Sequence, residues 1–358
     1  MLSSKIKKAA GATKLQSNPS LYYPRPSLSG PERCLRQMVY WSAQYPPDKE
    51  AGDRFVLVLD DSKWHEELTA DWLRKIYTLH SEQMGVDIFR LDFLPTEPKF
   101  FCKTCQKWLP GNMLHGHIDG ILQELSEPDV EYLYEHKAIN HFTFNRYWNG
   151  DVPVDYLTQS CLYFKGLKSL MPHLNRGILL IKNKNTSQYI DYYFIYDEQT
   201  DVCTITEIEH SSGEVKTSPI ILKDILSDVA DKFYAIYQNT IDRTLPVRPY
   251  LPNTEFPCGY CNWEPTCWDG YEGDFGNTAA ALPEEFGYKS SRYLEITSEM
   301  KDLKEEKESL RSEFLRALTE LKTTVGTIRH YKAIMTIKTK EDGGISQSFT
   351  IKRIKKET

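Results

Sequence analysis

Two acidic residues of this chain, Asp119 and Glu135, lie within apolar-rich stretches where a charge needs an explanation. A carboxylate inside a core strand is costly unless it binds a metal ion or a partner group. Side chains alternate along a strand, so Glu135 and Lys137 point to one face and His136 to the other. Carboxylate oxygens suit Mg²⁺ or Mn²⁺, and an ammonium group beside them can stabilise charge on a phosphate. The pattern predicts a metal site suited to phosphodiester hydrolysis, although an E-x-K taken alone is far more typical of an exposed pair on an edge strand.

Further polar residues flank these carboxylates. Gln159 and Tyr163 are four positions apart in a helix expected over 153–170, so they share one face. They either contact a phosphate or base near the scissile bond or anchor a half-buried helix. His80, which we expect at the end of a helix over 64–84, is a candidate metal ligand. His117 is a rival candidate, since it shares a strand face with Asp119, and His115 is another.

Four cysteines have the spacing of a metal cluster. Cys258, Cys261 and Cys267 form C-x2-C-x5-C, and Cys34 precedes the first expected helix. Three closely spaced thiolates with one distant partner suit an iron–sulfur cluster or zinc. In a cytosolic protein, metal ligation is a better reading of eight cysteines than a disulfide framework.

A second C-x2-C pair, Cys102 and Cys105, leaves an alternative open. These two thiols could join Cys258 and Cys261 at a Zn²⁺ site. That arrangement would leave Cys34 and Cys267 without a role. Otherwise Cys102 and Cys105 are free thiols on a hairpin or a separate weak metal site.

The composition sets broad limits on function. The 358 residues are 40% hydrophobic and carry a net charge of −6, so there is no global basic signature of nucleic-acid binding. Residues 1–33 nevertheless hold six Lys or Arg against one acidic residue, and residues 331–358 hold seven against three. No apolar run is long enough for a membrane span, and the N-terminus lacks a signal-peptide core. We expect a cytosolic protein with local basic tracks and no membrane partner.

Three regions are expected along the chain. Residues 1–30 read as a flexible arm, 31–276 as the main domain, and 288–358 as an appendage made of a long helix and a β-hairpin. The helix shows a heptad-like pattern over 288–328, and alternation around Glu341–Gly344 predicts the hairpin over 331–354. Another helix is expected over 220–240. Strands are expected over 97–109, 114–123, 130–139, 177–183 and 189–196.

The order His80, Gly116-x-x-Asp119, Glu135-x-Lys137 and Gln159-x-x-x-Tyr163 resembles the RecB-like branch of the PD-(D/E)XK nuclease superfamily. The resemblance covers about residues 31–270, with Ile118 in place of the family's usual proline. It implies an α/β fold with a restriction-endonuclease-like core, in which a central mixed sheet is flanked by helices. It also implies that the metal ligands are His80, Asp119, Glu135 and the backbone carbonyl of His136. By the same resemblance Lys137 is the catalytic lysine, and Gln159 and Tyr163 form an accessory DNA-binding motif.

The cysteine spacing is similar to that of the iron–sulfur RecB-like nucleases, which include the CRISPR adaptation nuclease and the nuclease domain of AddB. This resemblance implies that Cys34, Cys258, Cys261 and Cys267 hold a [4Fe–4S] cluster that staples the two ends of the domain together. The long helix followed by a hairpin resembles, more weakly, the tails of YqaJ-type phage recombination exonucleases.

Together these patterns lead us to expect a metal-dependent DNA exonuclease in a bacterial cell or phage-infected host. Its expected substrates are single-stranded or duplex DNA ends in end processing, recombination or replication. Tyr163, Phe142 and Trp148 are candidates to stack on unpaired bases. The C-terminal helix packs on its own domain, pairs with another copy, or docks a recombination or replication protein. Two alternatives stay open: a CRISPR prespacer-trimming nuclease, and a non-catalytic zinc-containing nucleic-acid-binding protein.

Overall fold

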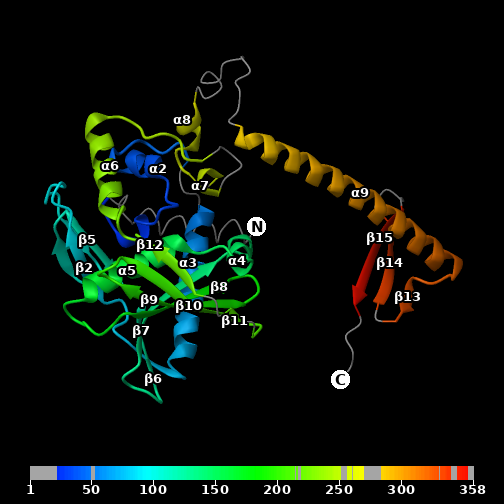
Figure 1. Cartoon of the computed structure of the whole chain (residues 1–358), viewed down its shortest axis with the longest axis horizontal. Coiled ribbons are helices and arrows are strands. Elements are labelled where there is room, and N and C mark those ends of the chain that lie inside the picture. Colours follow the sequence, from blue (N-terminus) through cyan, green and yellow to red (C-terminus); the bar gives the residue numbers. More distant parts are fainter. Residues whose placement is uncertain are drawn as a thin grey trace. The chain divides into compact units, whose positions relative to one another are not determined.

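The computed structural model describes residues 22–49, 53–213, 215–216, 219–250, 256–259, 261–269, 284–329, 331–339 and 345–353. These residues form two compact units, one up to residue 271 and one from residue 272 on (Figure 1). Residues 1–21 of the expected arm, residues 341–344 of the expected turn and residues 354–356 of the final basic run lie outside the described part. Of the helices described, none is long and apolar enough to cross a bilayer.

The first unit is built on a mixed sheet whose strands run in the order β1-β6-β7-β8-β9-β10-β11, with β12 also paired to β10. β7 and β8 are parallel, while the other neighbours are antiparallel. This confirms an α/β fold with a central mixed sheet flanked by helices. The strands are β1 (Tyr77–His80), β6 (Gly120–Glu124), β7 (Glu131–Ile139), β8 (Arg176–Asn183), β9 (Tyr189–Asp197), β10 (Val202–His210), β11 (Val215–Lys216) and β12 (Ile220–Lys223).

Helices cover both faces of this sheet. In β7 and β8, buried apolar residues point to both faces, so each face needs a covering layer. On one face α5 (Val154–Leu167) and α4 (His141–Trp148) bury apolar residues against Leu133 and Leu179. On the other face the end of α3 (Asp53–Leu73) packs on Tyr134 and Leu180. β7 therefore lies between two helical layers, which is where the predicted carboxylate and lysine stand.

In a third layer, the N-terminal part of the unit packs against its C-terminal part. α2 (Leu35–Ser42) packs on α6 (Val229–Asp242) around Val39 and Phe233. Two short helices, α7 (Phe256–Gly259) and α8 (Glu264–Trp268), follow. The 3₁₀ helix η1 (Pro26–Leu28) contacts α5 and β5, so residues 22–30 of the expected arm lie against the body of the unit.

Two small sheets complete the unit. β2 (Gly85–Arg90) pairs with β5 (Met113–His117), and β3 (Phe100–Cys102) pairs with β4 (Lys107–Leu109) as a hairpin. The strand predicted over 97–109 is thus a hairpin with its turn at residues 103–106. The strand predicted over 114–123 is likewise interrupted at Ile118 and Asp119, where the chain passes from β5 to β6.

Two helix predictions were wrong in their bounds. The helix expected over 64–84 ends at Leu73, and residues 77–80 form β1, because this β-prone stretch pairs with β6. The helix expected over 220–240 begins only at Val229, since Ile220–Lys223 pairs with β10 as β12. In both cases tertiary strand pairing overrides a helical pattern of apolar residues.

The second unit consists of a long helix and a three-stranded sheet. Its elements are α9 (Glu285–Glu320), β13 (Val325–Ile328), β14 (Tyr331–Thr339) and β15 (Ile345–Arg353). The predicted hairpin is confirmed by the antiparallel pairing of β14 with β15. The heptad pattern predicted a helix as far as residue 328. The helix α9 ends at Glu320, and residues 325–328 form the additional strand β13. Leu318, Ala333 and Met335 form the core, and Phe314 stacks on Phe349 with ring centroids 5.4 Å apart.

Asp191 on β9 gives a stability prediction that is independent of function. One of its carboxylate oxygens is buried without a partner among the described residues, and burial, aided by the charge of Glu209, raises its pKa to about 7. An unfolded aspartate titrates near 4, so the folded state loses stability as the pH rises from about 4 to 7. Asp191→Asn should therefore raise the melting temperature by a few degrees at pH 8 and far less at pH 4.5. Calorimetry at the two pH values checks this, and an equal shift at both would contradict it.

Candidate active site

Asp119 stands in the two-residue step between β5 and β6, at the edge of the main sheet. Its Oδ2 accepts a hydrogen bond from the backbone N–H of His136 on β7 at 2.8 Å. Two glycines shape this step. A Cβ at Gly116 would lie 2.8 Å from the Tyr163 ring, and one at Gly120 would lie 2.6 Å from Leu79. The Gly-x-x-Asp-Gly sequence thus lets β5 and β6 approach α5 and β1 closely enough to bring Asp119 to β7.

Glu135 is the most deeply buried carboxylate of the site, with 1% of its surface exposed. Its Oε1 accepts from the Lys137 ammonium and, at 2.8 Å, from the Gln159 side-chain amide. Its Oε2 is buried and has no hydrogen-bond partner among the described residues. A buried carboxylate oxygen left without a donor is expensive, and a cation beside it would remove that cost.

The carboxylates around Glu135 repel one another, and the ammonium of Lys137 partly offsets this repulsion. Burial, and next the charge of Asp119, raises the pKa of Glu135 to about 8. Burial alone would lower the pKa of Lys137, but the carboxylates of Glu135 and Asp119 raise it above its ordinary value. Lys137 is therefore a permanent ammonium. It also donates to the backbone carbonyl of His136 at 3.1 Å, so it makes two of the contacts that a metal cation here would make.

Glu66 on α3 is a third carboxylate within electrostatic range of Asp119 and Glu135, and no sequence pattern predicted its role. Burial and the charge of Asp119 raise its pKa, while Lys137 lowers it. Glu66 also raises the pKa of Glu135, so the three carboxylates and one ammonium form a single electrostatic cluster. A glutamate on a polar helix gives no signal in one sequence, because its role depends on the docking of α3 against β7.

His80 lies apart from this cluster in its described contacts. It is the last residue of β1, and its Nε2 lies 3.4 Å from Glu131 Oε1. Glu131 also pairs with His173 at 2.9 Å. Neither Asp119 nor Glu135 is a described partner of His80. Glu66, in contrast, is within electrostatic range of Asp119 and Glu135.

His136 contributes only backbone atoms to the cluster. Its N–H donates to Asp119, and its carbonyl faces Lys137. Its ring points to the opposite face, where both nitrogens are buried without a partner among the described residues. Burial, together with the positive charges of Lys137 and Lys182, lowers the pKa of the ring to about 3, so it is neutral.

Gln159 and Tyr163 share one face of α5, as predicted, but they face Glu135 and not the surface. Gln159 is 8% and Tyr163 is 3% exposed, and the Gln159 amide donates to the Tyr163 hydroxyl at 3.1 Å. A side chain this buried does not fit the expected stacking of Tyr163 on an unpaired base. Phe142, in contrast, is 83% exposed at the start of α4, while Trp148 stacks on His210.

These contacts predict that Gln159 and Tyr163 position Glu135. Gln159→Ala should raise the metal concentration needed for half-maximal cleavage by roughly 10-fold or more, as removal of a group that orients a ligand does. Tyr163→Phe removes only the hydroxyl and should have a smaller effect in the same direction. DNA binding in Ca²⁺ should be nearly unchanged in both variants. A loss of DNA binding at unchanged metal dependence would instead favour a direct contact with DNA.

The four cysteines of the predicted cluster gather at the layer formed by α2 and the end of the unit. Cys34 precedes α2, Cys258 lies on α7 and Cys267 on α8. Burial, and after it the charges of Cys34, Cys267 and Cys258, raise the pKa of Cys261 to about 11, so all four thiols are within electrostatic range of one another. The segment that carries Cys258, Cys261 and Cys267 contacts the N-terminal region, which lies more than 200 positions earlier in the chain.

Direct contacts show this tie. The Trp263 indole donates to the Tyr45 carbonyl at 3.0 Å and stacks on Tyr40. Asp48 accepts from the hydroxyl and the backbone N–H of Thr266 at 2.6 and 2.8 Å. The fold thus brings together thiols that are far apart in sequence, as four-thiolate ligation requires.

Cys102 and Cys105 have different neighbours from those of the zinc alternative that joins them to Cys258 and Cys261. Their sulfurs meet His115 and His117, and the four ligand atoms lie within 4.8 Å of one another. These residues can hold a metal ion. The rival assignment placed His117 at the carboxylate site, but its ring nitrogen contacts the sulfurs of Cys102 and Cys105 instead.

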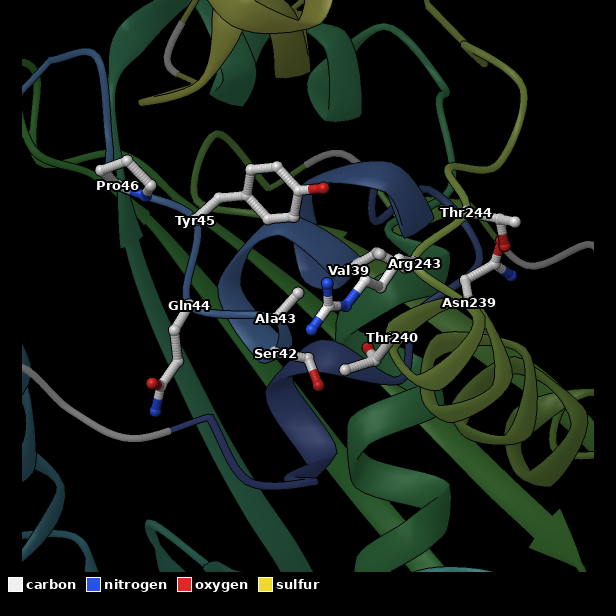
Figure 2. A pocket seen from close by; sticks show the side chains of 10 residues that line it. All are labelled: Val39, Ser42, Ala43, Gln44, Tyr45, Pro46, Asn239, Thr240, Arg243 and Thr244. Carbon is white, nitrogen blue, oxygen red and sulfur yellow. The ribbon is translucent and has the colours of Figure 1, made fainter.

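A pocket of about 560 Å³ lies elsewhere, between the end of α2 and α6. Figure 2 shows Arg243 reaching from the end of α6 toward Val39 and Ala43. None of the carboxylates lines it, so it is separate from the cluster around Glu135. Comparison of the chain with protein-family models, with curated proteins and with solved structures gave no match.

Proposed function

We propose that this protein is a metal-dependent DNA nuclease of the PD-(D/E)XK type, acting as an exonuclease on DNA ends. The observation that carries the proposal is Oε2 of Glu135, which is buried without a hydrogen-bond partner among the described residues. The Lys137 ammonium contacts the same carboxylate, and Asp119 and Glu66 are within electrostatic range. Carboxylates that repel one another around a buried, unsatisfied oxygen form a set that a divalent cation with oxygen ligands fits. The Asp119 and Glu135 carboxylates would hold Mg²⁺ or Mn²⁺ together with the His136 carbonyl. Glu66, which is within electrostatic range but outside the spacing of a single-ion group, would add negative charge nearby.

The chain's own residues divide the work around such an ion. When bound, Mg²⁺ or Mn²⁺ would supply Lewis-acid polarisation of the phosphate and a lower pKa for an attacking water. The Gln159 side-chain amide on α5 donates to Oε1 of Glu135. Oε2 of the same carboxylate would then be the oxygen available to a cation. The permanent ammonium of Lys137 is placed to hold the attacking water or to stabilise the developing negative charge on the phosphate.

The gathered thiols support a second part of the proposal, a [4Fe–4S] cluster on Cys34, Cys258, Cys261 and Cys267. A single tetrahedral zinc would draw four thiolates to ~3.8 Å from one another, whereas a four-iron cluster keeps its ligands farther apart. Among the described residues, the group close enough for one ion is the Cys102 group and not this one. The four thiols join α2 to α7 and α8, so the cluster would be structural.

Cleavage of matched DNA forms tests the proposed activity. Purified protein is incubated with Mn²⁺, Mg²⁺ or EDTA and with end-labelled linear DNA or covalently closed circular DNA of the same sequence. The proposal predicts nucleotide release from linear DNA with either metal, none in EDTA, and none from the closed circle. Cutting of the circle at the same rate would replace the exonuclease with an endonuclease, and no cutting of any DNA would reject the nuclease.

A further inference from the structure

A second constellation of metal-ligating residues lies outside the carboxylate site and outside the four-thiol group. Cys102 and Cys105 belong to the β3–β4 hairpin, and His115 and His117 belong to β5. The His117 Nε2 lies 3.2 Å from Cys102 Sγ and 3.1 Å from Cys105 Sγ. The His115 Nε2 lies 3.5 Å from Cys105 Sγ.

These spacings match the edges of a tetrahedron around zinc. With Zn–S bonds of about 2.3 Å and Zn–N bonds of about 2.1 Å, neighbouring ligand atoms are ~3.5 Å apart. All four ligand atoms already lie within 4.8 Å of one another, and two of the residues are buried. Two thiolates and two imidazoles are a set typical of Zn²⁺, whereas Mg²⁺ and Ca²⁺ take oxygen ligands.

The surroundings of the ligands are also those of a metal site. The Nδ1 of His115 lies 2.6 Å from a carboxylate oxygen of Asp87, which fixes the proton on Nδ1 and leaves Nε2 free to face the sulfurs. Carboxylates that hold metal-binding histidines in this way are common outer partners of zinc ligands. Lys107 lies 3.3 Å from the same carboxylate group and holds Asp87 in place.

The backbone is shaped around the thiols as well. The N–H of Cys105 donates to Cys102 Sγ at 3.3 Å, which fixes the position of that sulfur in the turn. Gln106, directly after Cys105, takes a left-handed conformation with φ of 54° and turns the chain back into β4. Gly85 on β2 leaves room for the second thiol, because a Cβ there would lie 2.2 Å from Cys105 Sγ.

We propose that Cys102, Cys105, His115 and His117 bind one Zn²⁺ that fixes the β3–β4 hairpin onto β5. The four protein ligands fill a tetrahedral shell, so the site is structural and not catalytic. The hairpin has only three residues in each strand, and such a short ribbon is not stable by itself. The ion thus supplies the fixed attachment that the hairpin's own pairing does not.

The zinc site also bears on the carboxylate cluster. Only Ile118 separates His117 from Asp119, so an ion that fixes the end of β5 fixes the start of the step that carries Asp119. This consequence rests on the proposed nuclease function, but the binding of zinc does not. The experiments therefore measure the metal directly.

The first test uses the wild-type chain. Protein purified with EDTA washes should retain about one zinc per chain by mass spectrometry of metals. Replacement by Co²⁺ should give the visible absorption bands of a tetrahedral site and the charge-transfer bands of thiolate ligands. A wild-type protein that holds no zinc after growth in zinc-supplemented medium and shows no cobalt bands would overturn the proposal. Both readouts are independent of nuclease activity, so a protein that binds zinc but cuts no DNA would reject only the proposed function.

Matched variants locate the ion. Cys102→Ser should lose the zinc, while Cys34→Ser, a thiol of the other group, should keep it. Asp87→Asn leaves all four ligands in place and should weaken zinc binding by roughly 10–100-fold in competition with a chelator, as loss of an outer partner does. This variant keeps the assignment testable if Cys102→Ser does not fold. Full zinc retention in Cys102→Ser, or loss in Cys34→Ser with retention in Cys102→Ser, would place the ion elsewhere and overturn the proposal.

Discussion

Glu135→Gln is expected to reduce metal-dependent DNA cleavage by at least roughly 10²–10³-fold, the effect of removing a group that stabilises the transition state. The substitution keeps the shape of the side chain and its contact with Gln159, but it removes the charge that faces Asp119 and Glu66. Asp119→Asn and Lys137→Met should have effects of the same order, because one removes a ligand and the other the ammonium. Initial rates of nucleotide release in saturating Mn²⁺ measure all three.

Glu131→Gln is the matched control for these variants. Glu131 stands four positions before Glu135 on the same face of β7, but its partners are His80 and His173. Its substitution should leave the rate within about 3-fold of the wild type, since its partners His80 and His173 lie outside the cluster around Glu135. Near wild-type rates for any two of the Asp119, Glu135 and Lys137 variants would contradict the assigned site.

The same assay distinguishes the two candidates for the third ligand. The electrostatic contact of Glu66 with Asp119 predicts a large loss of activity in Glu66→Gln. The contact of His80 with Glu131 predicts only a small loss in His80→Ala. The reverse result would restore the ligand role that the family resemblance gives to His80.

The second large effect is expected at the cysteines. Protein made anaerobically should be brown and contain about four iron atoms per chain. Cys34→Ser should lose the iron and lower the free energy of unfolding by roughly 3–5 kcal/mol, as the loss of a cross-link across a long loop does. The reason is structural, because the cluster would join the start of α2 to α7 and α8. Without it, this end segment is held to the N-terminal region by contacts such as Trp263 with Tyr45 and Thr266 with Asp48. Iron content and the denaturant midpoint provide the two measurements.

Cys102→Ser serves as the control, since it belongs to the other thiol group and should keep the iron. A colourless anaerobic wild-type preparation without iron would contradict the cluster. Loss of iron in Cys102→Ser with retention in Cys34→Ser would exchange the roles of the two groups.

Much of the site's layout could be predicted from the sequence because its residues lie on regular strands and on one helix. Side-chain alternation on β7 places Glu135 and Lys137 together, as their contact shows, and helical spacing places Gln159 beside Tyr163. The C-terminal hairpin followed from alternation around turn residues, whereas the central mixed sheet was what the family resemblance implied. Each of these relations is local, within a few residues or between neighbouring strands.

The remaining features depend on contacts between distant segments. Glu66 joins the cluster only because α3 docks against β7, and a charged residue on a polar helix carries no sign of that. His115 and His117 alternate on one strand, and their meeting with Cys102 and Cys105 depends on how the hairpin folds onto β5. The C-x2-C followed by H-x-H was nevertheless a signal, and the competing assignment of His117 to the carboxylates obscured it.

The most direct test of the central claim compares wild type with Glu135→Gln, prepared in parallel, for hydrolysis of linear DNA as Mn²⁺ is raised from zero. We predict that the wild type releases nucleotides in proportion to bound Mn²⁺ and that the variant releases at most about 1% as much. Equal release by both proteins, or none by the wild type at any Mn²⁺ concentration, would contradict a metal-dependent nuclease centred on Glu135.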